Sequence, residues 1–264
     1  MDGLSYLKTI LLGIIQGITE FLPISSSAHL LLFSDFLNKG KSIPLFYNVA
    51  LHFGTALAIL VYFRKDWLQI MFSLKKYPVV DKNQKLLLNL IIGSIPAAII
   101  GLSFKNFIEK HLHNTYTIIL PLGIFGIVLW LIDSKTKEKK NLYELKRGQA
   151  FLIGLGQTLA LIPGVSRSAA TIVVCRLLNL SRLDSARFSF LLGTPAMFGA
   201  AFLERKEFYL NIGSPEFHLG LLSSFFVGLI SIHFFLKIIS HFGFFAFAFY
   251  RVLLSLFLSF LYFF

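Results

Sequence analysis

Six long apolar runs dominate the pattern of hydrophobic and polar positions along the chain. They cover residues 46–63, 86–104, 116–132, 185–203, 217–240 and 243–264. A helix needs about 20 mostly apolar residues to cross a bilayer, so each run is predicted to be a transmembrane helix. Two further apolar stretches, 4–34 and 149–180, are interrupted at their centres by proline, glycine and serine. Each of these is predicted to be one broken spanning helix or a re-entrant hairpin.

The two interrupted stretches repeat each other at a constant offset of 141 residues. The matching pairs are Gly13 and Gly154, Gln16 and Gln157, Ser25 and Ser166, Ser27 and Ser168, and Ala28 and Ala169. The pattern predicts one all-α membrane domain over residues 1–264, with repeats at about 1–132 and 148–264. Each repeat is expected to hold one interrupted helical hairpin and three transmembrane helices. If the interrupted stretches are re-entrant, three crossings separate the repeats, and the second repeat is then predicted to be inverted relative to the first.

Composition and charge agree with a membrane protein. Hydrophobic residues make up 56% of the 264 residues and charged residues only 14%, whereas soluble domains carry about 25% charge. The mean hydropathy is +0.73. The net charge of +12 is confined to short loops, which argues against nucleic acid as a partner and indicates orientation in a membrane. Cys175 is the only cysteine, so an internal disulfide is excluded.

Loop charges orient the predicted spans. Lysine and arginine are abundant in loops 64–85 and 133–147, which are therefore predicted to be cytoplasmic. Loops 105–115 and 204–216 have fewer basic residues and are predicted to lie on the opposite side. The first interrupted stretch would then enter from outside and the second from the cytoplasm. Their tips are expected to meet near the bilayer midplane, shielded from lipid by protein.

The first interrupted stretch combines a carboxylate, hydroxyls and an imidazole. Gln16 and Glu20 are four residues apart and share a helix face, and Pro23 is predicted to end that helix. A new helix is expected to begin in the serine run of Ser25, Ser26 and Ser27, where free backbone amides suit an anion. His29 follows Ser26 by three residues, which predicts a hydroxyl and an imidazole side by side.

The second stretch supplies an arginine in a similar setting. Pro163 and Gly164 break the chain, and Ser166, Arg167 and Ser168 offer a helix start, hydroxyl donors and a guanidinium. Such groups suit a phosphate, and a carboxylate beside them suits a divalent cation bridging phosphate oxygens. The predicted phosphate-binding residues are Ser25, Ser27, Gly164, Ser166, Ser168 and Thr171.

Glu20 and Arg167 stand out because a charge at the centre of a bilayer costs roughly 2.5–3.5 kcal/mol. A charge at that depth needs a function or a partner. The structural alternative is a Glu20–Arg167 ion pair that only holds the repeats together. His52 and Asn48 are further candidates to line the same cavity. Five other basic residues are expected to snorkel to an interface: Lys8, Arg176, Arg187, Lys237 and Arg251.

At these motifs the chain resembles the bacterial undecaprenyl-diphosphate phosphatases, also called bacitracin-resistance proteins. The resemblance rests on Gln16-x-x-x-Glu20 followed by 23–29, on 163–171, and on shorter matches at 188–192 and 248–251. Two positions depart from the family pattern. Gln16 stands where many members have a second glutamate, and Ala28 where glycine is common.

The resemblance implies hydrolysis of a C55 polyprenyl diphosphate to the monophosphate, assisted by Mg2+ or Ca2+. This reaction recycles the lipid carrier for peptidoglycan synthesis and confers bacitracin resistance, which implies the bacterial cytoplasmic membrane. Glu20 is then the candidate metal ligand, with Gln16 as a neutral oxygen ligand. The lipid substrate and the bilayer are the expected partners, and the oligomeric state is left open, a homodimer included.

The catalytic residues expected from this interpretation are Ser26, His29, Glu20 and Arg167. Arg167 neutralises the β-phosphate, and Ser26 attacks phosphorus with His29 or Glu20 as the base. Direct attack by His29 is an alternative. A transporter that flips polyprenyl phosphate is the alternative from another class, because inverted repeats with broken midplane helices are also a transporter design.

Overall fold

The computed structural model describes residues 3–38, 44–75, 81–104, 107, 110–111 and 115–263. These residues form helices and turns, with no β-strand among them. The helices of the first half are α1 (Gly3–Thr19), α2 (Ser26–Asn38), α3 (Leu45–Tyr62), α4 (Arg64–Ser73), α5 (Lys82–Ser103) and α7 (Thr115–Lys135). Those of the second half are η1 (Leu142–Glu144), α8 (Arg147–Thr158), η2 (Leu159–Leu161), α9 (Arg167–Leu177), α10 (Arg182–Leu203), α11 (Arg205–Asn211), α12 (Pro215–Phe242) and α13 (Phe245–Phe263).

The six predicted transmembrane helices are all present. α3, α5, α7, α10, α12 and α13 are long and apolar enough to cross a membrane. Their bounds follow the apolar runs closely, as α3 at Leu45–Tyr62 does for the run 46–63. The protein is therefore an all-α, multi-pass membrane protein.

Both interrupted stretches are pairs of helices joined by a turn. α1 and α2 form the first pair, and α8 and α9, with the short η2 between them, form the second. α1 ends at Thr19 rather than at Pro23, so Glu20 lies just beyond the helix. Most of the predicted loop 105–115 lies outside the described residues. The two repeats, their boundaries and their inversion stay predictions.

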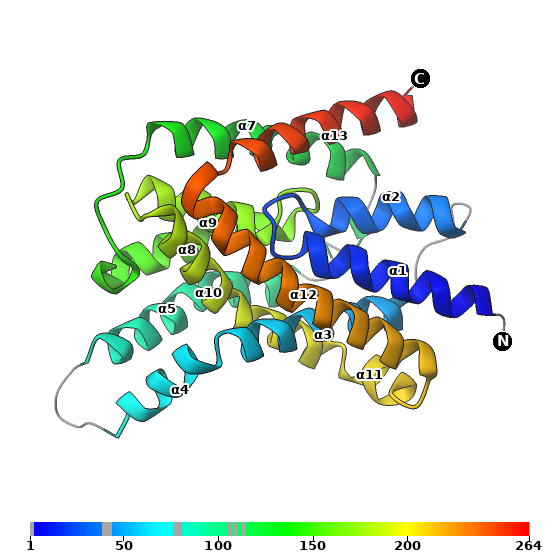
Figure 1. Cartoon of the computed structure of the whole chain (residues 1–264), viewed down its shortest axis with the longest axis horizontal. Coiled ribbons are helices and arrows are strands. Elements are labelled where there is room, and N and C mark those ends of the chain that lie inside the picture. Colours follow the sequence, from blue (N-terminus) through cyan, green and yellow to red (C-terminus); the bar gives the residue numbers. More distant parts are fainter. Residues whose placement is uncertain are drawn as a thin grey trace.

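Close helix contacts give the bundle its shape (Figure 1). α1 packs along α12, α12 along α3, α8 along α5, and α13 along α7. A Cβ on Gly17 of α1 would lie 2.9 Å from the amide nitrogen of Gly228 in α12, and one on Gly154 of α8 would overlap the carbonyl of Gly93 in α5. Small residues at these crossings let the backbones approach, which is how helices associate without a hydrophobic driving force in lipid.

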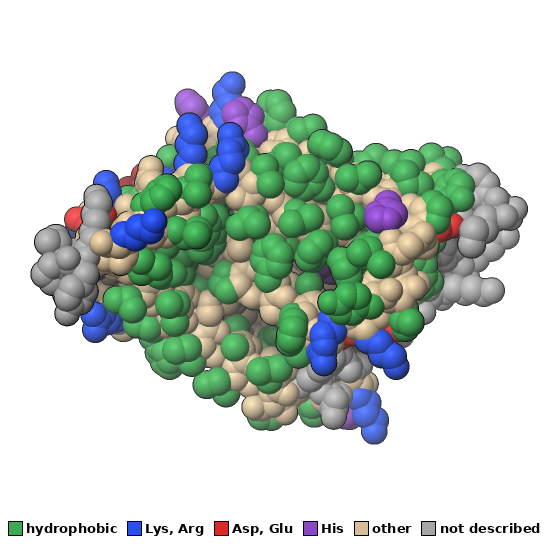
Figure 2. Space-filling view, turned by 90° about the horizontal axis from the view of Figure 1, so that it is seen from below, with side chains coloured by type: hydrophobic (Ala, Val, Ile, Leu, Met, Phe, Trp, Pro, Cys, Tyr) green, Lys and Arg blue, Asp and Glu red, His purple; other side chains and the backbone are tan. Residues whose placement is uncertain are grey.

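The outer surface is apolar over a wide area. Figure 2 shows hydrophobic side chains over most of one face, with lysine and arginine gathered towards its margins. On α13, Phe249, Phe257 and Phe260 are each more than half exposed. A soluble protein rarely exposes such a continuous apolar face, whereas lipid accommodates it.

Arg176 and Arg251 are buried, which contradicts the prediction that they snorkel. Arg176 is 1% exposed and pairs with Asp133 at 2.8 Å and Glu138 at 3.1 Å. Asp133 also pairs with Arg182 at 3.0 Å, so these charges connect the end of α7 to α9 and α10. Arg251 is 0% exposed and lies beside the site described next. Both charges are partnered within the protein, as burial requires.

Candidate active site

The two serine-rich turns share an unusual backbone conformation. Ser25 and Ser166 each have a φ of 72°, which is uncommon for a residue other than glycine. Each stands immediately before a helix, α2 at Ser26 and α9 at Arg167. A strained conformation persists only where the surrounding structure holds it, and such residues gather at functional sites. The matching sequence positions therefore also match in backbone geometry.

Direct hydrogen bonds join the two turns. The backbone amide of Gly164 donates to the Ser27 hydroxyl at 3.3 Å, and the Ser168 hydroxyl donates to the Leu22 carbonyl at 3.3 Å. Within each turn two serines that are two positions apart also bond, Ser25 with Ser27 and Ser166 with Ser168. Residues about 140 positions apart in sequence are thus hydrogen-bonded to one another.

The Glu20 carboxylate is the hub of this site. Oε1 accepts a hydrogen bond from Arg167 Nη2 at 3.1 Å, and Oε2 accepts one from the Ser26 hydroxyl at 2.9 Å. Gln16 Nε2 donates to Oε2 at 3.1 Å, which confirms that Gln16 and Glu20 share a face. His52 Nδ1 lies 3.8 Å from Oε2, so His52 belongs to the same cluster. The carboxylate is 9% exposed, and its burial is tolerated because these groups compensate its charge.

Arg167 is held at the boundary between the motifs. Its Nη1 donates to the Ser189 carbonyl at 3.2 Å, and Nη2 also lies 3.3 Å from Met197 Sδ. A Cβ at Gly193 of α10 would overlap the guanidinium, so glycine there makes room for it. Arg167 remains 14% exposed. Of its five N–H donors, some are left for an anionic ligand.

His29 is turned away from the Ser26 hydroxyl. Its Nδ1 bonds the Ser25 carbonyl at 2.8 Å, and its Nε2 bonds the Tyr250 hydroxyl at 2.7 Å. The Ser26 hydroxyl is bonded to Glu20 instead. Of the two bases that the sequence left open for Ser26, Glu20 is the one in hydrogen-bond contact.

Several predicted phosphate ligands are buried and bound to protein groups. Thr171 is 0% exposed and bonds the Arg167 carbonyl and the Ser189 hydroxyl. Ser25 and Ser168 are each 1% exposed. Ser27 is exposed, and Ser26 and Ser166 are half-buried. The accessible hydroxyls are therefore Ser26, Ser27 and Ser166, and phosphate binding by the full set stays a prediction.

Arg251 of α13 connects the two turns through hydrogen bonds to their backbone carbonyls. Its guanidinium donates to the carbonyls of Pro23 at 3.1 Å, Gly164 at 2.9 Å, Val165 at 3.0 Å and Leu122 at 3.1 Å. Gly164 has a φ of 89°, and a Cβ there would overlap the Ile118 backbone, so the turn requires glycine. This role differs from the interfacial position predicted for Arg251, although an arginine within an apolar helix signals buried partners.

The residues at Glu20 fit a divalent cation held together with a phosphate ligand. Gln16 uses Nε2 for Glu20 and His52, and its Oε1 is buried with no hydrogen-bond partner among the described residues. An unpartnered oxygen beside a carboxylate is a ligand that Mg2+ and Ca2+ prefer. Among the residues that the structure describes, there is no group of three or more His, Cys, Asp or Glu side chains that could hold a metal ion. Mg2+ characteristically takes one or two protein ligands and completes its shell with substrate phosphates and water.

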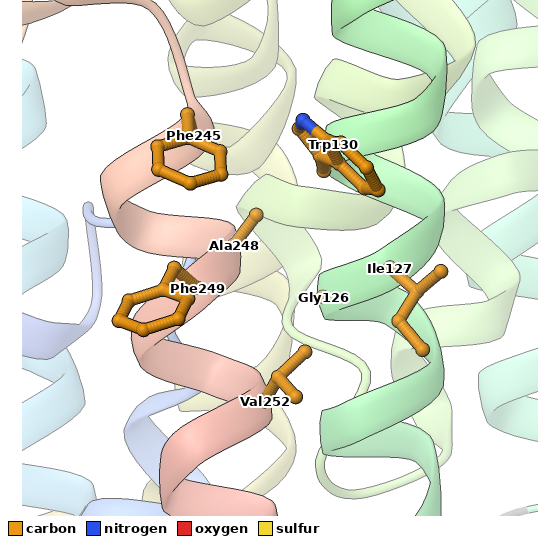
Figure 3. Close-up of a pocket in the computed structure, with 7 residues that line it drawn as sticks. All are labelled: Gly126, Ile127, Trp130, Phe245, Ala248, Phe249 and Val252. Atoms are coloured by element: carbon orange, nitrogen blue, oxygen red, sulfur yellow. The ribbon is translucent and has the colours of Figure 1, made fainter.

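A separate hollow of about 310 Å³ opens between α7 and α13 (Figure 3). Its lining is aliphatic and aromatic: Gly126, Ile127, Trp130, Phe245, Ala248, Phe249 and Val252. This hollow has no group that binds or hydrolyses a phosphate. The two serine-rich turns therefore remain the candidate site.

The fold and the site define a multi-pass membrane protein in which two serine-rich turns join a buried carboxylate to an arginine. The family model described as bacitracin resistance protein BacA matches residues 9–257, and the chain belongs to this family. Curated relatives named undecaprenyl-diphosphatase occur in several bacteria. The protein from Caldicellulosiruptor bescii is 42% identical, with 94% of both chains covered. That from Desulforudis audaxviator is 40% identical over 94% of both chains, and that from Bifidobacterium longum is 38% identical over 94% of this chain and 91% of the relative.

Proposed function

We propose that the protein is an integral membrane phosphatase that hydrolyses undecaprenyl diphosphate to the monophosphate and inorganic phosphate. This reaction recycles the lipid carrier of cell-wall synthesis and confers bacitracin resistance. The observation that carries the proposal is the Glu20 hub, which joins the Ser26 hydroxyl of one motif to the Arg167 guanidinium of the other. The name shared by the relatives supplies the substrate class.

Arg167 is the proposed binding group for the terminal phosphate. A guanidinium forms bidentate hydrogen bonds to phosphate, and the exposed Ser27 hydroxyl and the amides at the start of α9 add donors. The arriving phosphate competes with Glu20 for Arg167. Substrate binding would thus leave the carboxylate better able to accept a proton.

Ser26 is the proposed nucleophile. Its hydroxyl already donates to Glu20 Oε2 at 2.9 Å, the geometry expected for a nucleophile and its base. As Ser26 Oγ bonds to the terminal phosphorus, its proton passes to Glu20 and the bond to the bridging oxygen breaks. The lipid monophosphate leaves with that electron pair, and water then releases phosphate from phospho-Ser26.

A divalent cation, Mg2+ or Ca2+, would be held by Glu20 and the Gln16 carbonyl oxygen. When bound it would neutralise the oxygens of the diphosphate. The unpartnered Gln16 Oε1 supports this assignment.

The apolar exterior supports a lipid substrate. Six helices are long and apolar enough to span a bilayer, and many large apolar side chains are exposed. We assign the protein to the bacterial cytoplasmic membrane, with the basic loops 64–85 and 133–147 in the cytoplasm. The polyprenyl chain would stay in the bilayer while the diphosphate enters the polar site.

Phosphate release from the purified protein in detergent tests this function. With a polyprenyl diphosphate and Mg2+, the wild type should release inorganic phosphate and Ser26→Ala should release none. A lipid transporter without hydrolytic activity would release no phosphate in either case, and that result would refute the proposal.

A further inference from the structure

The pair formed by His29 and Tyr250 is a second polar unit at the site, and the chemistry proposed for Ser26 and Glu20 does not use it. His29 is buried at 5% exposure, whereas Tyr250 on α13 is 41% exposed. The two rings stack at a centroid distance of 5.6 Å and an angle of 15°. The tyrosine thus joins the buried imidazole to a partly exposed side chain of α13.

The hydrogen bonds determine which nitrogen of His29 holds the proton. The Ser25 carbonyl only accepts, so the Nδ1 atom 2.8 Å away must donate. In the neutral imidazole Nε2 then has a free lone pair, and the Tyr250 hydroxyl at 2.7 Å donates to it. The basic nitrogen of His29 is aimed at Tyr250.

The proposed reaction needs a second base when water attacks phospho-Ser26. Glu20 accepts the Ser26 proton in the first step and is then protonated. The attack of water on phospho-Ser26 releases another proton, which Glu20 cannot accept while it holds the first. His29 lies one helical turn after Ser26, and its accepting nitrogen is reached through Tyr250.

We propose that Tyr250 and His29 form a proton relay for the second half of the reaction, the hydrolysis of phospho-Ser26. This inference rests on the proposed covalent role of Ser26. As the water oxygen bonds to phosphorus, its proton passes to the Tyr250 oxygen and the tyrosine proton passes to His29 Nε2. The bond between phosphorus and Ser26 Oγ breaks, and Oγ recovers a proton from Glu20. The imidazolium then returns its proton to solvent through Tyr250.

Trapping the phosphoenzyme tests the relay. A substrate labelled in the terminal phosphate is mixed with the protein and quenched in acid, which preserves a phosphoserine. Tyr250→Phe keeps the stacked ring and removes only the hydroxyl. Steady turnover should fall by about 10²-fold, the low end of a general-base contribution, while label accumulates on Ser26 to nearly one per protein. His29→Gln should trap the same adduct, and the double variant should be little slower than either single one.

The chain offers a matched control in Tyr62 of α3, whose hydroxyl lies 3.4 Å from His233 Nδ1 of α12. Tyr62→Phe removes an equivalent tyrosine–histidine contact and should turn over like the wild type without accumulating label. Accumulated label in Tyr250→Phe would also show that this variant folds and completes the first step.

Three outcomes would overturn the relay. The first is normal turnover in Tyr250→Phe, and the second is slow turnover with no accumulated adduct. The third is a wild type that releases phosphate while no variant ever yields label, which would refute the covalent step but leave the phosphatase function intact. A wild type that releases no phosphate would refute the proposed function itself.

Discussion

The two serine-rich turns share one unusual backbone conformation and differ in their chemistry. Ser25 and Ser166 share a φ of 72°, and both turns have a bonded pair of serines. At the position of Ser26 the second turn has Arg167, and at the positions of Glu20 and His29 it has Leu161 and Ala170. One turn thus provides the carboxylate, hydroxyl and imidazole, and the other provides the cation. The two turns thus bring unlike groups to the same cluster of hydrogen bonds.

Removing the cation from the second half should have the largest effect. Arg167→Ala should lower turnover by about 10³-fold or more, because the guanidinium stabilises charge on the phosphoryl group in transfer. Arg167→Lys should restore little of the turnover, since the single ammonium of lysine does not replace the planar, bidentate donors of the guanidinium. Phosphate release measures both. Arg187→Ala is the control, as Arg187 of α10 pairs with Asp66 of α4 at 2.7 Å. Near-normal activity in Arg167→Lys would reduce Arg167 to a structural counter-charge.

Neutralising the Glu20 carboxylate of the first turn should lower turnover by nearly as much as removing Arg167. Glu20→Gln keeps the shape but removes both the proposed base and the charge that would hold a cation. Activity should collapse and return, if at all, only at much higher Mg2+ or Ca2+. Gln16→Glu is the opposite change and should keep activity while increasing the apparent affinity for the cation. An unchanged metal dependence in Glu20→Gln would place the cation elsewhere.

Substituting Arg251, which donates hydrogen bonds to carbonyls of both turns, should have a smaller effect on activity. Arg251→Lys replaces a planar donor that reaches four carbonyls with a single ammonium. Each buried carbonyl that loses its donor should cost roughly 1–3 kcal/mol. Thermal unfolding in detergent should show a lower midpoint, whereas Arg205→Lys should not, because Arg205 is exposed and contacts the carbonyl and the ring of Phe202 in its own segment. Equal midpoints of thermal unfolding for the two variants would show that Arg251 does not stabilise the turns.

Much of the fold follows from the sequence because length and apolarity alone identify a spanning helix. The runs 46–63 and 217–240 became α3 at Leu45–Tyr62 and α12 at Pro215–Phe242. The meeting of Glu20 with Arg167 was also predictable, since both charges lie in apolar stretches that repeat each other. The hydrogen-bond partners of individual side chains could not be predicted in the same way. Helix periodicity placed Ser26 beside His29, whereas the Ser25 turn directs the hydroxyl to Glu20.

The role of α13 was beyond sequence reasoning for a related reason. Arg251 and Tyr250 bond groups that are 86 to 228 residues away along the chain. Spacing rules describe neighbours on one helix and give no information about such contacts. Arg251 was therefore assigned to an interface, although its side chain is fully buried.

A double-mutant cycle between Glu20 and Arg167 tests most directly whether the two turns form one active site. Glu20→Gln, Arg167→Lys and the double variant are compared with the wild type by kcat/KM for phosphate release. If the two residues act as a unit, the double variant should be about as slow as the slower single variant. Losses that multiply across the two substitutions would mean that the turns act independently, and would contradict the account.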